Sequence, residues 1–113
     1  MEQDRRRTPR YPFAAPVELV EAGSGTKTTL KISELSLNGC YVDTPNPMEN
    51  GTALTIKVFK ESQFFEAPAR VVYSQANHGM GLMFHDVKPY FAQVLQKWIL
   101  AAMVAKKGLG SHS

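Results

Sequence analysis

This sequence of 113 residues has little of three things: cysteine, charge and long apolar runs. Cys40 is its one cysteine, so the chain can form no internal disulfide and no zinc site built on cysteine pairs. Charged residues make up only 20% of the chain and hydrophobic residues 43%, a balance that argues against general disorder. The composition therefore predicts one small folded domain that suits a reducing compartment.

Segments that could enter or cross a membrane are also absent from the sequence. The longest uncharged apolar run near the C-terminus, Trp98–Ala105, is far shorter than the roughly 20 residues of a membrane-spanning helix. The first residues, MEQDRRR, are followed by no apolar stretch, so we expect no secretory signal. We therefore expect a cytoplasmic protein that is not inserted into a membrane.

The positive charge of the chain is small but unevenly placed. The sequence has 13 Lys and Arg against 10 Asp and Glu, which gives a net charge of +3. Near the N-terminus, Pro9 and Pro12 disfavour a helix. The same segment holds a cluster of arginines: Arg5, Arg6, Arg7 and Arg10. Residues 1–12 are therefore predicted to form a flexible basic arm.

The segment 13–85 alternates apolar and polar side chains with the period of two that is typical of half-buried strands. Six short runs show this alternation, and turn residues separate them. Their spacing predicts a mainly β fold, a six-stranded antiparallel barrel. The side chains expected to face inward are Phe13, Ala15, Val17, Leu19, Thr28, Leu30, Ile32, Cys40, Val42, Leu54, Ile56, Val58, Phe65, Ala67, Ala69, Val71, Tyr73, Met80, Leu82 and Phe84.

The apolar period changes to that of an amphipathic helix over residues 87–106. Asp86 suits the cap of this helix, Pro89 its first turn and Gly108 its end. We expect the helix to cover the barrel or one of its open ends, and its exposed remainder is a candidate surface for a homodimer. Its predicted apolar face consists of Val87, Phe91, Val94, Leu95, Trp98 and Ala102.

The predicted organisation therefore has three zones. The basic arm occupies residues 1–12, the barrel with its C-terminal helix occupies 13–106, and a disordered tail occupies 107–113. The sequence shows no internal repeat and no low-complexity segment.

Motifs of catalysis and of metal binding are missing. The three histidines, His78, His85 and His112, have no second ligand at helical or hairpin spacing. Cys40 alternates toward the core and no His–carboxylate pair is placed to activate it, so we expect a small buried side chain. No serine-nucleophile motif or Walker loop is present. We expect neither an enzyme nor a bound metal or cofactor.

Two segments carry chemistry that suits a nucleotide. The clustered guanidiniums of the arm repel one another unless an anion meets them, and a guanidinium can grip phosphate or the edge of guanine. In the segment ELSLNG, Glu34 can accept from guanine N1–H and N2–H, and Ser36 can donate to phosphate. Gly39 permits a turn or the close approach of a ligand. Each segment alone also fits a solvated tail or an ordinary turn.

Together the two segments resemble the signature of the PilZ domain family, receptors for the bacterial second messenger cyclic di-GMP. That family pairs an R-x-x-x-R arm with a D/N-x-S-x-x-G turn. Arg6 and Arg10 match the first element, and Ser36 and Gly39 match the second, whereas Glu34 stands where the family has Asp or Asn. The stretch GMGLMF is similar to the last strand of the family. The resemblance covers nearly the whole chain and implies a six-stranded barrel with a C-terminal helix.

The resemblance also implies a function, a receptor or adaptor module whose ligand is cyclic di-GMP. The ligand would lie on the outer surface of the barrel, between the arm and the segment 34–39. Binding would order the arm and change the surface that an effector protein recognises. The implied ligand-binding residues are Arg5, Arg6, Arg10, Glu34, Ser36 and Gly39, and Arg70 and Tyr73 are further candidates.

Two other functions stay open at this point. Glu34, as the departure from the family signature, favours an adaptor of the same fold that contacts proteins without the nucleotide. A small-barrel nucleic-acid binder would instead spread basic and aromatic residues over one face of the barrel. The strand lysines are scattered, which argues against that class: Lys27, Lys31, Lys57 and Lys60.

Overall fold

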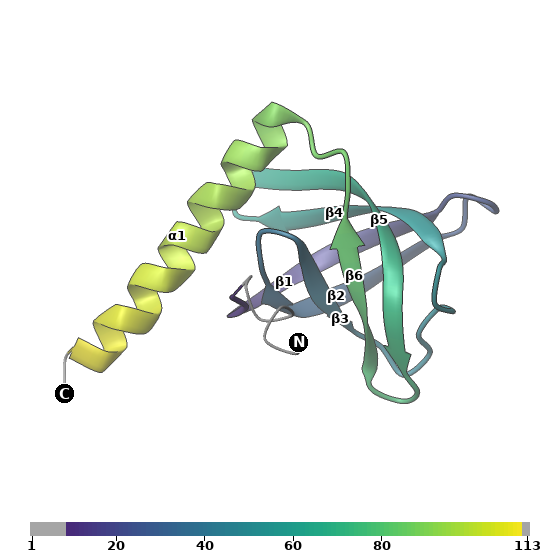
Figure 1. Ribbon diagram of the computed structural model, residues 1–113, viewed down its shortest axis with the longest axis horizontal. Coiled ribbons are helices and arrows are strands. Elements are labelled where there is room, and N and C mark those ends of the chain that lie inside the picture. The colour runs from purple at the N-terminus through teal and green to yellow at the C-terminus, as the bar shows by residue number, and fades with distance from the viewer. Residues whose placement is uncertain (1–8, 112–113) are drawn as a thin grey trace, which may run out of the picture.

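The computed structural model describes residues 9–111, with side chains described for residues 9–105. Six antiparallel strands close into a barrel in the order β1-β2-β3-β6-β5-β4, and one helix follows them (Figure 1). The predicted barrel and C-terminal helix are therefore confirmed. The elements are β1 (Tyr11–Glu21), β2 (Lys27–Leu35), β3 (Gly39–Asp43), β4 (Ala53–Lys60), β5 (Gln63–Gln75), β6 (Gly79–Phe84) and α1 (Pro89–Ser111).

The core lies inside the barrel, where the apolar faces of all six strands meet. Val17, Ile56, Val58 and Phe65 have no exposed surface, and nearly all the other side chains predicted to face inward are buried. Full burial of a Val, Ile, Leu, Phe or Met side chain contributes roughly 1.5–3 kcal/mol to the free energy of unfolding. Because one face of every strand is apolar, the six strands bury these faces together when the barrel closes.

A β-bulge near the end of β2 changes which side chains face outward. Ile32 and Glu34 pair with successive residues of β3, so β2 has one residue more than its partner at this point. Strict alternation would place Glu34 on the same face as Ile32. With the extra residue, Leu35 is buried instead, and Ser33 and Glu34 are both partly exposed. The bulge therefore presents the Glu34 carboxylate on the outer surface.

A second bulge lies in β5 and corrects one prediction. Val71 pairs with Leu82 of β6, and Tyr73 pairs with the next residue along, Gly81. The residue between them on β5 is therefore extra, and the side chains beyond it change faces. Tyr73 was predicted to face inward, which is wrong: its side chain is 38% exposed on the outer surface.

The ends of the helix also differ from the prediction. Pro89 is in the first turn as predicted, but the carbonyl of Lys88 accepts the first helical hydrogen bond, from the Ala92 N–H at 2.8 Å. Lys88 is thus the N-cap, whereas Asp86 lies in the preceding turn with φ of 51°. At the other end, Gly108 stays helical and forms no left-handed cap, so the helix runs to Ser111 and includes most of the predicted tail.

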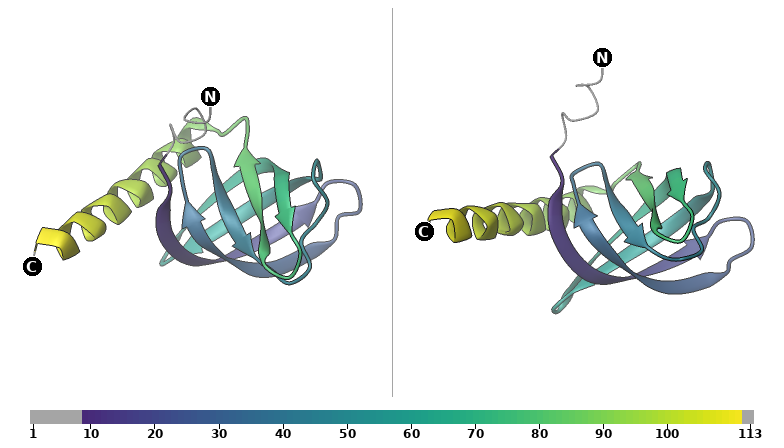
Figure 2. Two further views of the ribbon diagram at one scale, coloured as in Figure 1. Left: turned by 60° about the horizontal axis from the view of Figure 1, so that its bottom comes forward. Right: turned by 90° about the horizontal axis from the view of Figure 1, so that it is seen from below.

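Helix α1 packs against the barrel with its first half only. Leu95, Trp98 and Ile99 are buried, and the Trp98 ring stacks on Phe13 of β1 with ring centroids 5.7 Å apart. The second half projects away from the barrel, and Leu100 is 59% exposed (Figure 2). Within the described chain, no helix has the length and apolar character needed to span a membrane.

Candidate functional site

The candidate site lies where the start of β1 meets the end of β2. Pro12 pairs with Glu34 in the β1–β2 register, and Arg10 directly precedes β1. This pairing brings the two segments singled out in the sequence together, although they lie far apart along the chain. Arg10 Nη1 is 3.8 Å from Glu34 Oε1, and the two side chains are 56% and 46% exposed.

The ion pair between Arg10 and Glu34 is weak and easily opened. Its separation of 3.8 Å exceeds that of a good hydrogen bond, and both groups face solvent. Exposed pairs of this kind contribute about 0–1 kcal/mol to stability. A ligand that offers stronger partners to both groups can therefore displace the pair at small cost.

Ser36, which was predicted to contact the ligand, has its side chain turned into the β2–β3 turn. Its side chain is buried, and its hydroxyl accepts from the N–H groups of Asn38 and Gly39 at 3.2 and 3.0 Å. The same hydroxyl lies 3.2 Å from the Gly39 carbonyl, to which it can donate. These contacts hold the turn between β2 and β3 in one shape. In the described conformation Ser36 therefore fixes the turn that follows Glu34, and its predicted contact with a ligand stays a prediction.

Position 39 has no room for a side chain, because the neighbouring strand β6 passes close to it. A Cβ at this position would lie 2.0 Å from the backbone oxygen of Leu82 on β6. Gly39 has no positive φ, so backbone freedom is not what this position requires. The sequence suggested room for a turn or a ligand, but the close approach seen here is that of β6.

The four other predicted site residues do not all lie in the described part of the chain. Arg5 and Arg6 lie outside the described residues, so their role stays a prediction. Arg70 on β5 pairs with Met83 of β6, and its Nη1 donates to the Gly51 carbonyl at 3.0 Å. Tyr73 lies on the outer surface, and its ring centroid is 6.0 Å from that of Tyr41 on β3.

Tyr41 is a candidate residue that the sequence did not reveal. It is the direct β3 partner of Glu34, a pairing that depends on the bulge in β2. Burial raises the pKa of the Tyr41 phenol above its usual value, and Tyr73, Asp43 and Glu34 add to the rise. The phenol therefore stays protonated, and it donates a hydrogen bond to Gln75 Oε1.

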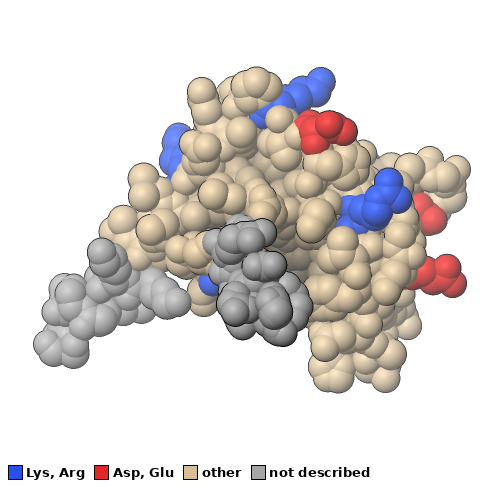
Figure 3. Space-filling view, in the orientation of Figure 1, with Lys and Arg blue, Asp and Glu red and all other residues tan. Residues whose placement is uncertain are grey.

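Charged side chains are sparse on the face of the barrel formed by β3, β6 and β5. Figure 3 shows this face, on which most of the surface is uncharged. Neutral aromatic and aliphatic groups supply much of that surface, among them Tyr73 at 38% exposed and Met83 at 51%. The surface beside Arg10 and Glu34 is therefore suited to flat, partly apolar groups.

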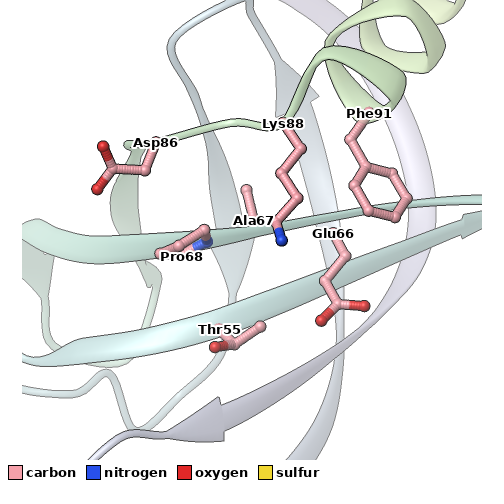
Figure 4. A pocket seen from close by; sticks show the side chains of 7 residues that line it. All are labelled: Thr55, Glu66, Ala67, Pro68, Asp86, Lys88 and Phe91. Carbon is pink, nitrogen blue, oxygen red and sulfur yellow. The ribbon is translucent and has the colours of Figure 1, made fainter.

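A separate hollow of about 270 Å³ lies on the β4–β5 side, under the segment that leads into α1 (Figure 4). Lys88, Phe91 and two carboxylates, Glu66 and Asp86, are among the residues that line it. Ligand pockets typically reach about 300–1,000 Å³, and carboxylates repel phosphate. This hollow is thus a poor fit to a nucleotide.

Cys40 is not an activated nucleophile. Cys40 is buried, and desolvation raises the pKa of its thiol far above the ordinary value. A thiol that stays protonated is a weak nucleophile. Among the described residues no group of three or more His, Cys, Asp and Glu side chains is arranged to hold a metal.

Several solved structures have the same fold, among them those of three proteins. The PilZ domain of YcgR from Escherichia coli, solved with cyclic di-GMP, is similar with a TM-score of 0.75 at 16% identity, over 96% of this chain and 99% of that one. The PilZ domain of CeSA from a cellulose-synthesizing bacterium has a TM-score of 0.63 at 20% identity, over 81% and 95%. MotI (DgrA), an inhibitor of motility from Bacillus subtilis, has a TM-score of 0.73 at 15% identity, over 90% and 53%.

The sequence comparison assigns the family. No curated protein matches the chain. The family model of the PilZ domain, however, matches residues 4–101, which include both motif segments, all six strands and the packed half of α1. Because this match spans most of the sequence and agrees with the barrel, the chain belongs to the PilZ domain family.

Proposed function

We propose that this chain is a receptor for cyclic di-GMP, which it binds at the corner formed by Arg10, Glu34 and the turn before Gly39. The observation that carries the proposal is the meeting of Arg10 and Glu34 at 3.8 Å on the outer surface of the barrel. A guanidinium and a carboxylate side by side match the phosphates and the guanine edges of this ligand. The fold likeness to the YcgR domain solved with cyclic di-GMP supports the same ligand.

Each predicted ligand-binding side chain has a defined part in the proposed complex. Arg6 and Arg10 bind guanine edges and phosphates, and Arg5 adds a phosphate or stacking contact. Glu34 accepts hydrogen bonds from guanine N1–H and N2–H. Charge-assisted hydrogen bonds of this kind are worth about 1.5–3 kcal/mol each. Ser36 contributes by holding the turn, through its bonds to the N–H groups of Asn38 and Gly39.

The output of the receptor is proposed to be contact with an effector protein. Leu37 stands at the centre of the turn with 49% of its surface exposed, and Met83 on the adjoining strand β6 is 51% exposed. A ligand bound at the corner adds a charged surface beside these apolar side chains. An effector that contacts both the ligand and Leu37 would bind only the occupied receptor.

Isothermal titration calorimetry of the full chain with cyclic di-GMP tests the proposal, with the linear dinucleotide of GMP as ligand control. We expect micromolar to submicromolar affinity, and Arg10→Ala should weaken it about 10- to 100-fold. Lys27→Ala is the matched control, because Lys27 is an exposed cation paired with Glu18 and not with Glu34. Absence of binding by the wild type, or equal losses in both variants, would contradict the proposal.

A second function is favoured by Glu34, which stands where the family signature has the shorter Asp or Asn. Its Oε1 lies 3.8 Å from Arg10 Nη1. If this pair stays closed, the chain is an adaptor that contacts its protein partner without the nucleotide. Titration of Glu34→Asp separates the two functions, because an adaptor with a blocked corner binds cyclic di-GMP only after this change.

A further inference from the structure

Two tyrosines form a continuous aromatic surface on the outside of the barrel. Tyr41 on β3 and Tyr73 on β5 are both direct register partners of Gly81, which lies between them on β6. Their ring centroids are 6.0 Å apart and their planes differ by 34°. Three adjacent strands thus carry a row of ring, glycine and ring, which we call the aromatic platform.

Glycines in β6 allow the two rings to lie against the strand. A Cβ on Gly81 would be 2.3 Å from Tyr73 Cε1, and a Cβ on Gly79 would be 2.6 Å from Tyr41 Cε2. Neither glycine has a positive φ, so their role here is to make room and not to relieve the backbone. At Gly79 the room serves both the Tyr41 ring and the Val42 carbonyl oxygen of β3, which would lie 2.3 Å from the added Cβ. The rings therefore cover the strand on one side, and Tyr73 keeps 38% of its surface exposed on the other.

The platform is held in place before any ligand arrives. The Tyr41 hydroxyl donates to Gln75 Oε1 on β5, which ties the ring across β6. The raised pKa of this phenol keeps it in the protonated state that donates. A rigid aromatic surface loses little conformational entropy when a second flat group stacks on it.

The platform continues the corner of Arg10 and Glu34. Tyr41 is the register partner of Glu34, and directly paired residues on one face of a sheet have Cβ atoms about 4.5–5.5 Å apart. The Glu34 carboxylate is among the groups that raise the pKa of Tyr41, which agrees with this proximity. The Glu34 acceptor and the stacking surface therefore lie in one row across the barrel wall, and the Arg10 guanidinium lies beside Glu34.

We propose that the aromatic platform stacks on a guanine base of the bound cyclic di-GMP, while Glu34 and Arg10 take the polar groups of the same ligand. This proposal rests on the function proposed above and extends it to Tyr41 and Tyr73. A base offers a flat face of the size of a tyrosine ring, and the uncharged surface over β6 lets it approach (Figure 3). Preference for a purine over a smaller pyrimidine follows from the width of two adjacent rings.

Calorimetry of Tyr73 variants of the full chain with cyclic di-GMP tests the platform. Tyr73→Leu should weaken binding by about 5- to 150-fold, the range of one stacked base, whereas Tyr73→Phe should stay within about twofold of the wild type. Tyr90→Leu is the matched control, since Tyr90 is a tyrosine of α1 that is 64% exposed and lies outside the platform. Thermal melting of each free variant checks that the barrel is intact.

A spectroscopic measurement on the unaltered protein provides a second test. A guanine stacked on tyrosine rings should show an upfield NMR shift of its H8 proton in the complex, and Tyr73→Phe should preserve this shift. If the wild type binds but Tyr73→Leu binds equally well, or H8 does not move upfield, the platform proposal is wrong and the proposed function stands. If the wild type binds no cyclic di-GMP, the proposed function fails and the platform proposal fails with it.

Discussion

At the scale of single residues, the motif of the second segment divides into two kinds of position. Glu34 is partly exposed and meets Arg10, so it is placed to contact a ligand. Ser36 is buried, and its hydroxyl closes the turn through two N–H groups. Gly39 is buried against the backbone of β6. In the described conformation Glu34 is therefore the exposed residue of the motif, and Ser36 and Gly39 shape the turn and the strand contact beside it.

The Glu34 side chain should control affinity without controlling stability. Glu34→Ala removes the proposed acceptor for guanine N–H groups and should weaken cyclic di-GMP binding by at least about tenfold. Glu34→Asp keeps the carboxylate and shortens its reach, so affinity should be retained or improved. Because the pair with Arg10 is exposed, the free energy of unfolding should change by less than about 1 kcal/mol in either variant.

Calorimetry measures the affinities of these two variants, and urea denaturation of the free proteins measures their stabilities. Unchanged affinity in Glu34→Ala would mean that this carboxylate does not contact the base. Binding by Glu34→Asp alone would instead favour the adaptor function.

At the scale of elements, the contact between β3 and β6 supports the candidate corner. Gly39→Ala would push a methyl group into the Leu82 carbonyl, which lies 2.0 Å from the position of the added Cβ. We expect a loss of about 1–3 kcal/mol in the free energy of unfolding, because the backbones of two paired strands must separate. Gly23→Ala is the matched control, since a Cβ at Gly23 meets nothing within 4 Å and φ there is not positive. Equal stabilities of the two variants in urea denaturation would rule out this account of Gly39.

Two neighbouring residues of helix α1 test whether the helix packs on one side only. Ile99 is 6% exposed against the barrel, whereas Leu100 is 59% exposed on the next position. Ile99→Ala should lower the free energy of unfolding by about 2–5 kcal/mol, and Leu100→Ala should change it by no more than about 0.5 kcal/mol. Chemical denaturation of both variants measures the difference. A large loss from Leu100→Ala would show that its side chain is covered in solution by something other than the barrel.

The strands were predictable from the sequence, because each must bury one face and therefore alternates. The exceptions are local: the extra residues in β2 and β5 shift Glu34 and Tyr73 to the outer face. A bulge has no strong signal in one sequence, since it depends on how two strands pair. The end of α1 was missed for a related reason, because Gly108 can stop a helix or continue it.

The candidate site was predictable in its residue types but not in its geometry. The charges of Arg10 and Glu34 suggested an anion and a guanine, and the barrel brings them together. Tyr41 was not predicted as a site residue, because its position beside Glu34 depends on both the β2–β3 pairing and the bulge. The buried role of Ser36 was hidden as well, since a hydroxyl in a polar turn looks the same in sequence whether it faces solvent or the turn.

At the scale of the whole molecule, ligand binding should raise the thermal stability of the barrel. A ligand that binds only the folded chain stabilises it by about 2.7 kcal/mol at a free concentration of 100 times the Kd. For a domain of this size the corresponding rise in Tm is about 10 °C. Differential scanning calorimetry with and without cyclic di-GMP measures this rise, and the linear dinucleotide of GMP provides the ligand control.

The dependence of this rise on salt reveals which forces hold the ligand. The chain has a net charge of +3, and the ligand carries two phosphates that the arginines are proposed to bind, so salt should screen much of the attraction. We expect the rise in Tm at a fixed ligand concentration to shrink as salt increases, and to be smaller in Arg10→Ala than in Lys27→Ala at every salt concentration. Stacking on Tyr41 and Tyr73 is not ionic, so a part of the rise should persist at high salt. If neither salt nor Arg10→Ala changed the rise in Tm, the ligand would bind away from the corner, because Arg10 is the arginine that the structure places beside Glu34.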